Sequence, residues 1–109
     1  MNNELLFISE QDGEVEREFK NALCQIFVNS RKPIRAYLAL AQWQQSNPLD
    51  VFLCLRVPGQ DDLVLLNQCA EVFKNMFAQD QHLDMIFIDE QQEQSLCKVC
   101  RPFYMSSNF

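Results

Sequence analysis

Residues 34–57 read IRAYLALAQWQQSNPLDVFLCLRV, and this stretch says more about the fold class than any other. It contains two apolar runs, residues 34–43 and 51–57, separated by the turn-forming residues Ser46-Asn47-Pro48. In the second run, Val and Leu alternate with Phe, Cys and Arg, which is the period-two pattern of a strand. The first run contains Ala and Leu, which also suit a helix, but Pro33 and the turn favour a strand. We therefore predict a β-hairpin.

Helical periodicity is found on both sides of this hairpin. Acidic residues fill the first turns of a helix over residues 14–30, where the helix dipole favours them. After Pro58-Gly59, Asp61 or Asp62 can cap a second helix. The apolar stripe of the first helix comprises Val15, Phe19, Ala22, Leu23, Ile26 and Phe27, and that of the second comprises Leu63, Leu66, Cys69, Ala70, Phe73 and Phe77.

Short apolar runs at residues 5–8 and 83–88 predict one strand before this block and one after it. A short helix over residues 90–100 follows and is stopped by Pro102. The order βαββαβ predicts an α+β, ferredoxin-like domain with an antiparallel sheet, two helices on one face and a short C-terminal helix. The first and last strands are expected side by side in the middle. We expect residues 1–109 to form a single domain.

The charge balance and the cysteine count limit the possible partners and compartments. Nine basic residues against fifteen acidic ones give a net charge of −6, so we expect no nucleic-acid partner. No apolar run approaches the roughly 20 residues that cross a bilayer, so we expect no membrane association. The five cysteines are an odd number, and no positively charged signal region opens the chain. Together these features predict a cytoplasmic protein with reduced thiols.

The second face of the predicted sheet is unusually apolar. If the leucines of the hairpin point at the two helices, alternation places an aromatic-rich set on the opposite face. Such a patch is typical of an interface, so we predict a protein partner or a homodimer. The alternatives are that the alternation is out of phase or that the C-terminal tail covers this face. The predicted interface residues are Tyr37, Ala39, Trp43, Phe52, Cys54 and Arg56.

Few residues suggest catalysis or metal binding. Cys97 and Cys100 form a CxxC pair near the end of a predicted helix, whereas a low thiol pKa requires a helix N-terminus. A second CxxC is absent, and His82 is the only histidine, so a zinc site lacks ligands. We interpret His82 as a solvent-facing loop residue and the acidic pairs Asp61-Asp62 and Asp89-Glu90 as helix caps. We expect no catalytic residue, no metal and no cofactor.

Four short stretches resemble the C-terminal domain of the SseB family, which is named for enhanced serine sensitivity in bacteria. They are the opening ELLFISE at residues 4–10, KPIRAY at residues 32–37, LDMI at residues 83–86 and RPFY at residues 101–104. The resemblance implies a bacterial, cytoplasmic setting and transfers no active site. Longer members carry an additional N-terminal domain, so we expect this chain to act alone or with a partner that supplies one.

Three hypotheses about function follow. The first is a non-catalytic protein-interaction or regulatory domain that self-associates or docks through the open sheet face. The second is a small-ligand sensor for an amino acid, which is motivated only by the serine phenotype of the family. The third is a thiol-redox enzyme acting through Cys97 and Cys100, which requires a depressed thiol pKa.

Overall fold

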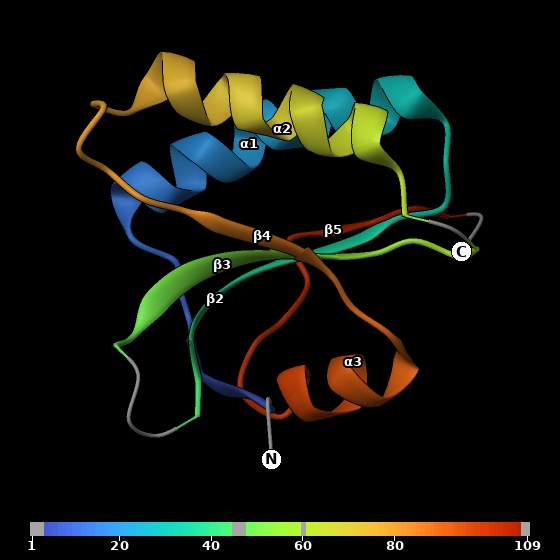
Figure 1. The fold of residues 1–109 in the computed structure, drawn as a ribbon. Helices are drawn as coiled ribbons and strands as arrows, with labels where there is room; N and C mark the ends of the chain where they lie inside the picture. The colour runs from blue at the N-terminus through green and yellow to red at the C-terminus, as the bar shows by residue number, and fades with distance from the viewer. Residues whose placement is uncertain (1–3, 45–47, 60, 108–109) are drawn as a thin grey trace.

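The computed structural model describes residues 4–44, 48–59 and 61–107. In it, a mixed β-sheet carries helices on both faces (Figure 1). The two longer helices lie together on one side of the sheet, and the short third helix lies on the other side. The elements are β1 (Leu5–Glu10), α1 (Glu14–Ser30), β2 (Arg35–Trp43), β3 (Asp50–Arg56), α2 (Leu63–Met76), β4 (Asp84–Phe87), α3 (Glu90–Leu96) and β5 (Tyr104–Met105).

The predicted hairpin is present as the antiparallel pair β2–β3, in which Tyr37 lies opposite Cys54. Of its predicted turn, Ser46 and Asn47 lie outside the described residues. β1 pairs antiparallel with the end of β2, and β5 pairs with its first two residues. Because β3 occupies one side of β2, β1 and β5 share the other side.

The predicted ferredoxin-like strand order is wrong. The sheet runs β1-β2-β3-β4, so β1 and β4 lie on opposite sides of the hairpin rather than side by side. The sheet is also not wholly antiparallel, because β4 runs parallel to β3. A parallel neighbour requires a long crossover, and α2 supplies it directly between these two strands. The sequence patterns identified every element except β5 and predicted the β2–β3 pairing, but they carried no information on the neighbours of β1 and β4.

Alternating residues of the hairpin contribute to two separate cores. Leu38 and Leu53 pack with Phe19 and Phe27 of α1 on one face, together with residues from α2. Leu63, which the sequence placed in the apolar stripe of α2, is 65% exposed, whereas Leu65 is buried. The opposite face has its own core, which comprises Leu5, Tyr37, Ala39, Ala41, Phe52, Cys54, Ile88, Leu96 and Cys100. In the described part of the chain, no helix is long and apolar enough to cross a membrane.

Candidate functional site

The sheet face that we predicted to be open is covered by α3 and the segment that follows it. Leu96 of α3 is fully buried, and Ile88 and Cys100 pack into the same core. The prediction of an open face is therefore wrong, and the alternative of coverage by the C-terminal region is confirmed. The alternation itself was in the predicted phase, so a face this apolar is buried within the chain.

The six predicted interface residues consequently have different surroundings. Tyr37, Ala39, Phe52 and Cys54 are each at most 2% exposed. They have no free surface to offer a partner, and they contribute instead to the core beneath α3. Trp43 is 38% exposed and rests edge-on against Phe52, with 6.2 Å between the ring centroids.

The sixth residue, Arg56, belongs to a polar cluster around the buried carboxylate of Glu93 in α3. Arg35 donates two hydrogen bonds of 2.7 Å to the two Glu93 oxygens, and Tyr37 donates one of 2.6 Å. The Nε atom of Arg56 lies 3.4 Å from Glu93 Oε1. We call these four residues the Glu93 cluster. It joins α3 to the neighbouring strands β2 and β3.

The Glu93 cluster keeps this buried carboxylate ionised. Burial opposes its charge, but the hydrogen bonds from Arg35 and Tyr37 and the charges of Arg35 and Arg56 outweigh it, so the pKa of Glu93 is lowered. Burial, together with the neighbouring Cys97 and Glu93, raises the pKa of Tyr37, which therefore stays a hydrogen-bond donor. The contacts of the Glu93 cluster therefore hold α3 on the sheet, which is a structural role.

One residue of each acidic pair caps a helix, as predicted. The Asp89 side chain accepts a hydrogen bond from the Gln92 backbone, and the Gln92 side chain accepts one from the Asp89 backbone, which completes a capping box on α3. Asp62 accepts a 3.0 Å hydrogen bond from the backbone of Leu65 at the start of α2 and forms an ion pair with Lys32.

The two CxxC cysteines lie at and beyond the C-terminal end of α3, not at a helix N-terminus, where a thiol pKa is lowered. Cys97 is exposed at the C-terminal end of α3, whereas Cys100 is buried and its thiol lies 3.5 Å from the Leu38 carbonyl oxygen. Burial raises the pKa of Cys100 to about 11, an effect to which the charge of Glu10 adds. Both thiols are free. This arrangement supports our interpretation of two thiols beside a packed helix.

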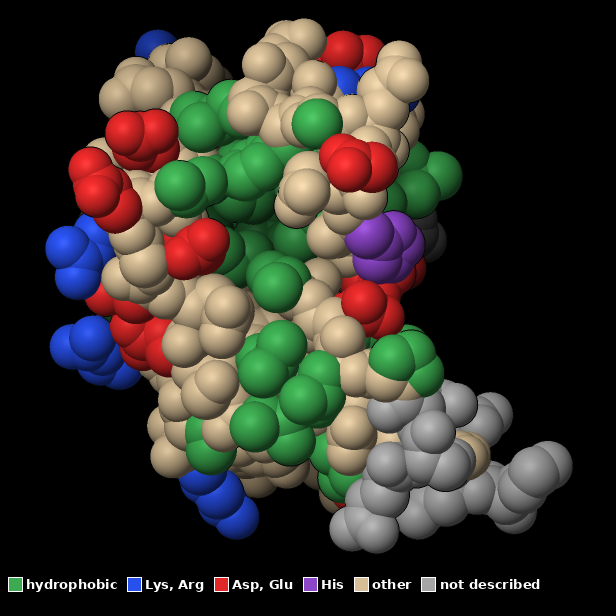
Figure 2. Space-filling view, turned by 90° about the vertical axis from the view of Figure 1, so that its left-hand side faces the viewer, with side chains coloured by type: hydrophobic (Ala, Val, Ile, Leu, Met, Phe, Trp, Pro, Cys, Tyr) green, Lys and Arg blue, Asp and Glu red, His purple; other side chains and the backbone are tan. Residues whose placement is uncertain are grey.

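A groove that sequence reasoning missed opens where α2 ends and the chain turns toward β4. We call it the α2 groove. It has a volume of about 570 Å³, and Phe73 and Phe77 stack in its wall with 4.8 Å between the ring centroids. Figure 2 shows hydrophobic side chains gathered in a hollow on this side of the molecule, with the histidine beside it. The α2 groove is lined by Phe73, Lys74, Phe77, Ala78, Gln79, Gln81, His82 and Leu83.

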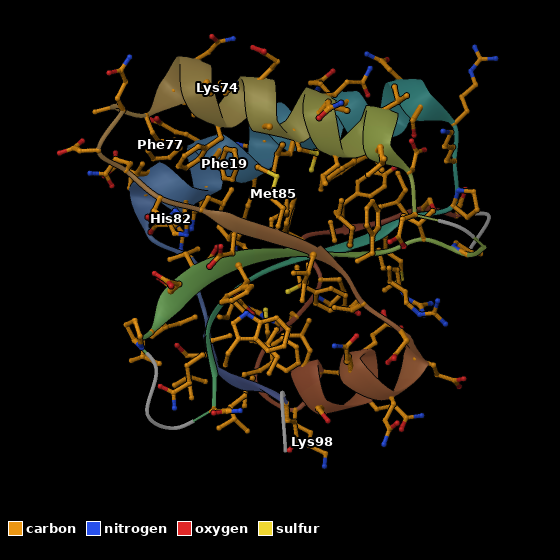
Figure 3. All side chains as sticks on the ribbon, viewed as in Figure 1. Phe19, Lys74, Phe77, His82, Met85 and Lys98 are labelled. Atoms are coloured by element: carbon orange, nitrogen blue, oxygen red, sulfur yellow. The ribbon has the colours of Figure 1, made fainter. Side chains whose placement is uncertain are left out.

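Phe77 of the α2 groove also packs into the main core. Its ring meets that of Phe19 edge-on, with 5.5 Å between the ring centroids. In Figure 3, Phe77 and Phe19 lie close together between the helices and the sheet, and His82 lies nearby on the segment that leads into β4. Phe73 and Phe77 were predicted as part of the apolar stripe of α2.

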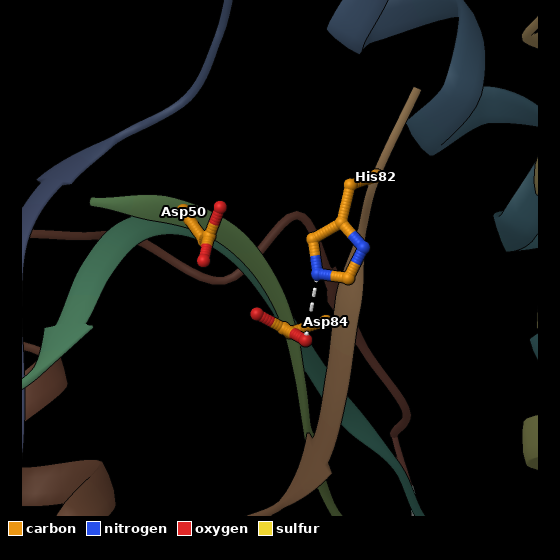
Figure 4. A group of neighbouring side chains, drawn as sticks. All are labelled: Asp50, His82 and Asp84. Carbon is orange, nitrogen blue, oxygen red and sulfur yellow. Dashed lines mark hydrogen bonds and ion pairs between the residues drawn. The ribbon is translucent and has the colours of Figure 1, made fainter. Parts of the chain in front are cut away.

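A group of two carboxylates and one imidazole lies next to the α2 groove. The ligand atoms of Asp50, His82 and Asp84 are all within 4.8 Å of one another, and His82 Nε2 is 3.0 Å from Asp84 Oδ1 (Figure 4). His82 is exposed, as predicted for a loop histidine, and the two aspartates are partly buried. The sequence alone did not bring Asp50 and Asp84 together, because their proximity depends on the parallel pairing of β3 with β4.

The fold and the surface together define a small α+β domain with a covered mixed sheet and an open groove on its helical layer. The family model described as SseB protein C-terminal domain matches residues 3–105 of this chain. The chain therefore belongs to the SseB C-terminal domain family. No curated protein and no solved structure matched it.

Two of the stretches that carry this family resemblance meet in the structure. The backbone N–H of Phe103, from RPFY, donates a 2.8 Å hydrogen bond to the carbonyl of Ala36, from KPIRAY. Tyr104, in β5, is the strand partner of Ala36 in β2. The ring of Tyr104 packs against that of Phe27, with 5.2 Å between the ring centroids. These residues attach the end of the chain to the sheet, so their role here is structural.

Proposed function

We propose that this chain is a non-catalytic interaction domain whose α2 groove receives a short apolar segment of another protein. The observation that supports this is the groove itself, in which the Phe73 and Phe77 rings remain partly exposed. Apolar surface that is left open beside polar groups is typical of binding sites. The proposed docking surface is therefore formed by Phe73 and Phe77 at the end of α2, not by the aromatic residues of the sheet that first suggested a partner.

The lining of the α2 groove indicates the chemistry of its occupant. The stacked phenylalanines and Leu83 suit an aliphatic or aromatic side chain. Lys74 and His82 supply polar contacts to the backbone carbonyls or a carboxylate of the same segment. A volume of about 570 Å³ is sufficient for a few side chains of a peptide rather than for a broad protein surface.

The test compares two substitutions that add the same side chain to α2 or to the segment just after it. Ala78 is exposed and lines the α2 groove, so Ala78→Arg fills the groove without disturbing a core. Asn75 is also exposed but does not line the groove, so Asn75→Arg is the matched control. Peptides selected from a random library against the folded chain are expected to bind the control and to lose at least about tenfold in affinity for Ala78→Arg.

Backbone NMR shifts locate the binding of the selected peptides. The largest shifts are expected at Phe73, Phe77 and Leu83, which line the α2 groove. Peptides that bind Ala78→Arg as tightly as the unmodified chain would rule the groove out as the docking site. A library that yields no groove-binding peptide would contradict the proposal in the same way.

An amino-acid sensor is the second candidate, and it uses the same groove. The volume of the α2 groove lies within the range of roughly 300–1,000 Å³ that small-molecule sites occupy. A thermal-shift screen of the twenty amino acids at millimolar concentration tests it, since a ligand that binds only the folded state raises the melting temperature. The sensor hypothesis fails if none of the twenty stabilises the chain.

A further inference from the structure

We propose that Asp50, His82 and Asp84 form a binding site for a divalent transition-metal ion of the zinc type. The three side chains offer two carboxylate oxygens and one imidazole nitrogen, all within 4.8 Å of one another. They come from two segments that are more than 30 residues apart in the chain, Asp50 from β3 and the other two from β4 and its approach. The inference does not require that the α2 groove binds a peptide, although His82 borders both sites.

The pairing of β3 with β4 explains why these three residues converge. The parallel register places Phe52 beside Asp84, so continuing it by two residues brings Asp50 level with His82. Residues two apart in an extended strand point to the same face, which directs His82 and Asp84 to one side. Figure 4 shows the three side chains pointing toward a common space beside the two strands.

The charges of this cluster favour a cation. Within the described ranges, no lysine or arginine forms an ion pair with Asp50 or Asp84, and the side chain of Asp84 contacts that of His82. Two other aspartates that converge with side chains of distant residues do have cationic partners: Asp12 pairs with Lys20 and Asp62 with Lys32. Two carboxylates that converge without a cationic side chain form an anionic spot that a divalent ion would neutralise.

The mixed donor set selects among divalent ions. Calcium and magnesium prefer all-oxygen surroundings, whereas an imidazole beside carboxylates suits zinc and its first-row neighbours. Zinc bonds of about 2.0–2.2 Å in a tetrahedron place ligand atoms about 3.3 Å apart, so 3.0 Å between His82 and Asp84 is already close. The Asp50 carboxylate needs to shift by about 1 Å or more, which a side chain at the end of a strand can do.

His82 makes the site straightforward to observe because it is the only histidine in the chain. In NMR, its imidazole signals report zinc binding without assignment ambiguity. The full chain with Cys97→Ser is the starting protein, because Cys97 is the exposed thiol that would compete for zinc. Titration with zinc chloride is expected to shift or broaden the His82 signals in a saturable manner, whereas magnesium and calcium chloride leave them in place.

Isosteric variants test the ligands individually. Asp50→Asn and Asp84→Asn are expected to weaken zinc affinity at least about tenfold, since each loses an anionic ligand. Asp80→Asn removes an exposed carboxylate from the same loop outside the cluster and is expected to leave the affinity unchanged. The proposal is overturned if His82 shows no saturable response to zinc, if both asparagine variants bind zinc as tightly as the starting protein, or if magnesium and calcium bind equally well.

Discussion

The hydroxyl of Tyr37 donates a 2.6 Å hydrogen bond to Oε2 of Glu93, which connects a central strand to a helix 56 residues further along the chain. Tyr37 is 1% exposed, so this bond lies inside the protein. Arg35 and Arg56 reach the same carboxylate. The short helix α3 is therefore held on the sheet by a defined polar contact as well as by the burial of Leu96.

Replacing Glu93 by glutamine is expected to destabilise the protein by about 2–3 kcal/mol. Glu93→Gln retains the shape of the side chain but leaves two arginines without their counter-charge, and their partial exposure moderates the loss. Urea unfolding measures the change, and Glu90→Gln in the exposed first turn of α3 is the control. If both variants unfold at the same urea concentration, the Glu93 cluster does not stabilise the fold.

Stability is expected to decrease as the pH falls below about 5. Hydrogen bonds from Arg101, Lys20 and Lys32 lower the pKa values of Glu10, Asp12 and Asp62, and the Glu93 cluster lowers that of Glu93. These carboxyls bind protons more readily in the unfolded chain, so acid favours unfolding as the pH falls from their unfolded values through their folded ones.

The free energy of unfolding, measured in urea between pH 7 and pH 3, checks this pH dependence. Glu93→Gln removes one of the four groups and should flatten the curve in that range. A curve that stays flat to pH 3 in the unmodified protein would show that these carboxyls have ordinary pKa values in the folded state.

Cys97 is expected to react with iodoacetamide well before the other thiols do. It is exposed, whereas burial raises the pKa of Cys69 to about 12 and that of Cys100 to about 11. Since the thiolate is the reactive form, Cys69 and Cys100 should be alkylated only when the chain unfolds. Mass spectrometry of timed samples gives the order. Rapid alkylation of Cys100 in the folded chain would revive the thiol-redox hypothesis.

Leu96→Ala is expected to cost about 2–4 kcal/mol, because Leu96 is fully buried between α3 and the sheet. Hydrogen exchange should accelerate in α3 before it does in β3. Val99→Ala, which shortens a side chain that is 39% exposed, is the control and should cost much less. Equal effects of the two substitutions would contradict the assignment of α3 as an integral cover of the sheet.

Self-association through Trp43 is a further prediction that sedimentation can check. Trp43 keeps 38% of its surface exposed, while the residues predicted to accompany it are buried or belong to the Glu93 cluster. If Trp43 alone mediates self-association, the chain sediments as a dimer at micromolar concentration and Trp43→Glu is a folded monomer. The contact with Phe52 is worth about 1 kcal/mol, so this variant should remain folded. An unmodified chain that sediments as a monomer would remove the hypothesis.

Local patterns in the sequence predicted most elements and one of the strand pairings. The period-two run beside the turn predicted the β2–β3 hairpin, and the stripe that includes Phe19, Leu23 and Phe27 predicted α1, in which all three are buried. Asp62 and Asp89 were assigned correctly as caps because capping depends on a backbone N–H three residues ahead. In each case the interacting groups are close in sequence.

Such local patterns did not predict the two candidate sites, which are the α2 groove and the Asp50–His82–Asp84 cluster. The α2 groove lies between the end of α2 and the segment that leads into β4, and the Asp50–His82–Asp84 cluster depends on the register that sets Asp50 level with His82. Neither condition leaves a periodic signal. Arg35 and Arg56 could be read as surface cations, because their partner Glu93 is more than 35 residues away from each.

The sequence by itself determined the helices, the hairpin, the two-sided apolar character of that hairpin and the family. Only the tertiary structure decided that β4 pairs in parallel with β3, that α3 covers the second face, and that a groove bordered by Phe73 and Phe77 opens at the end of α2. The physical reason is that backbone periodicity and capping are local properties of the chain. Strand order and coverage depend instead on which distant surfaces exclude water together.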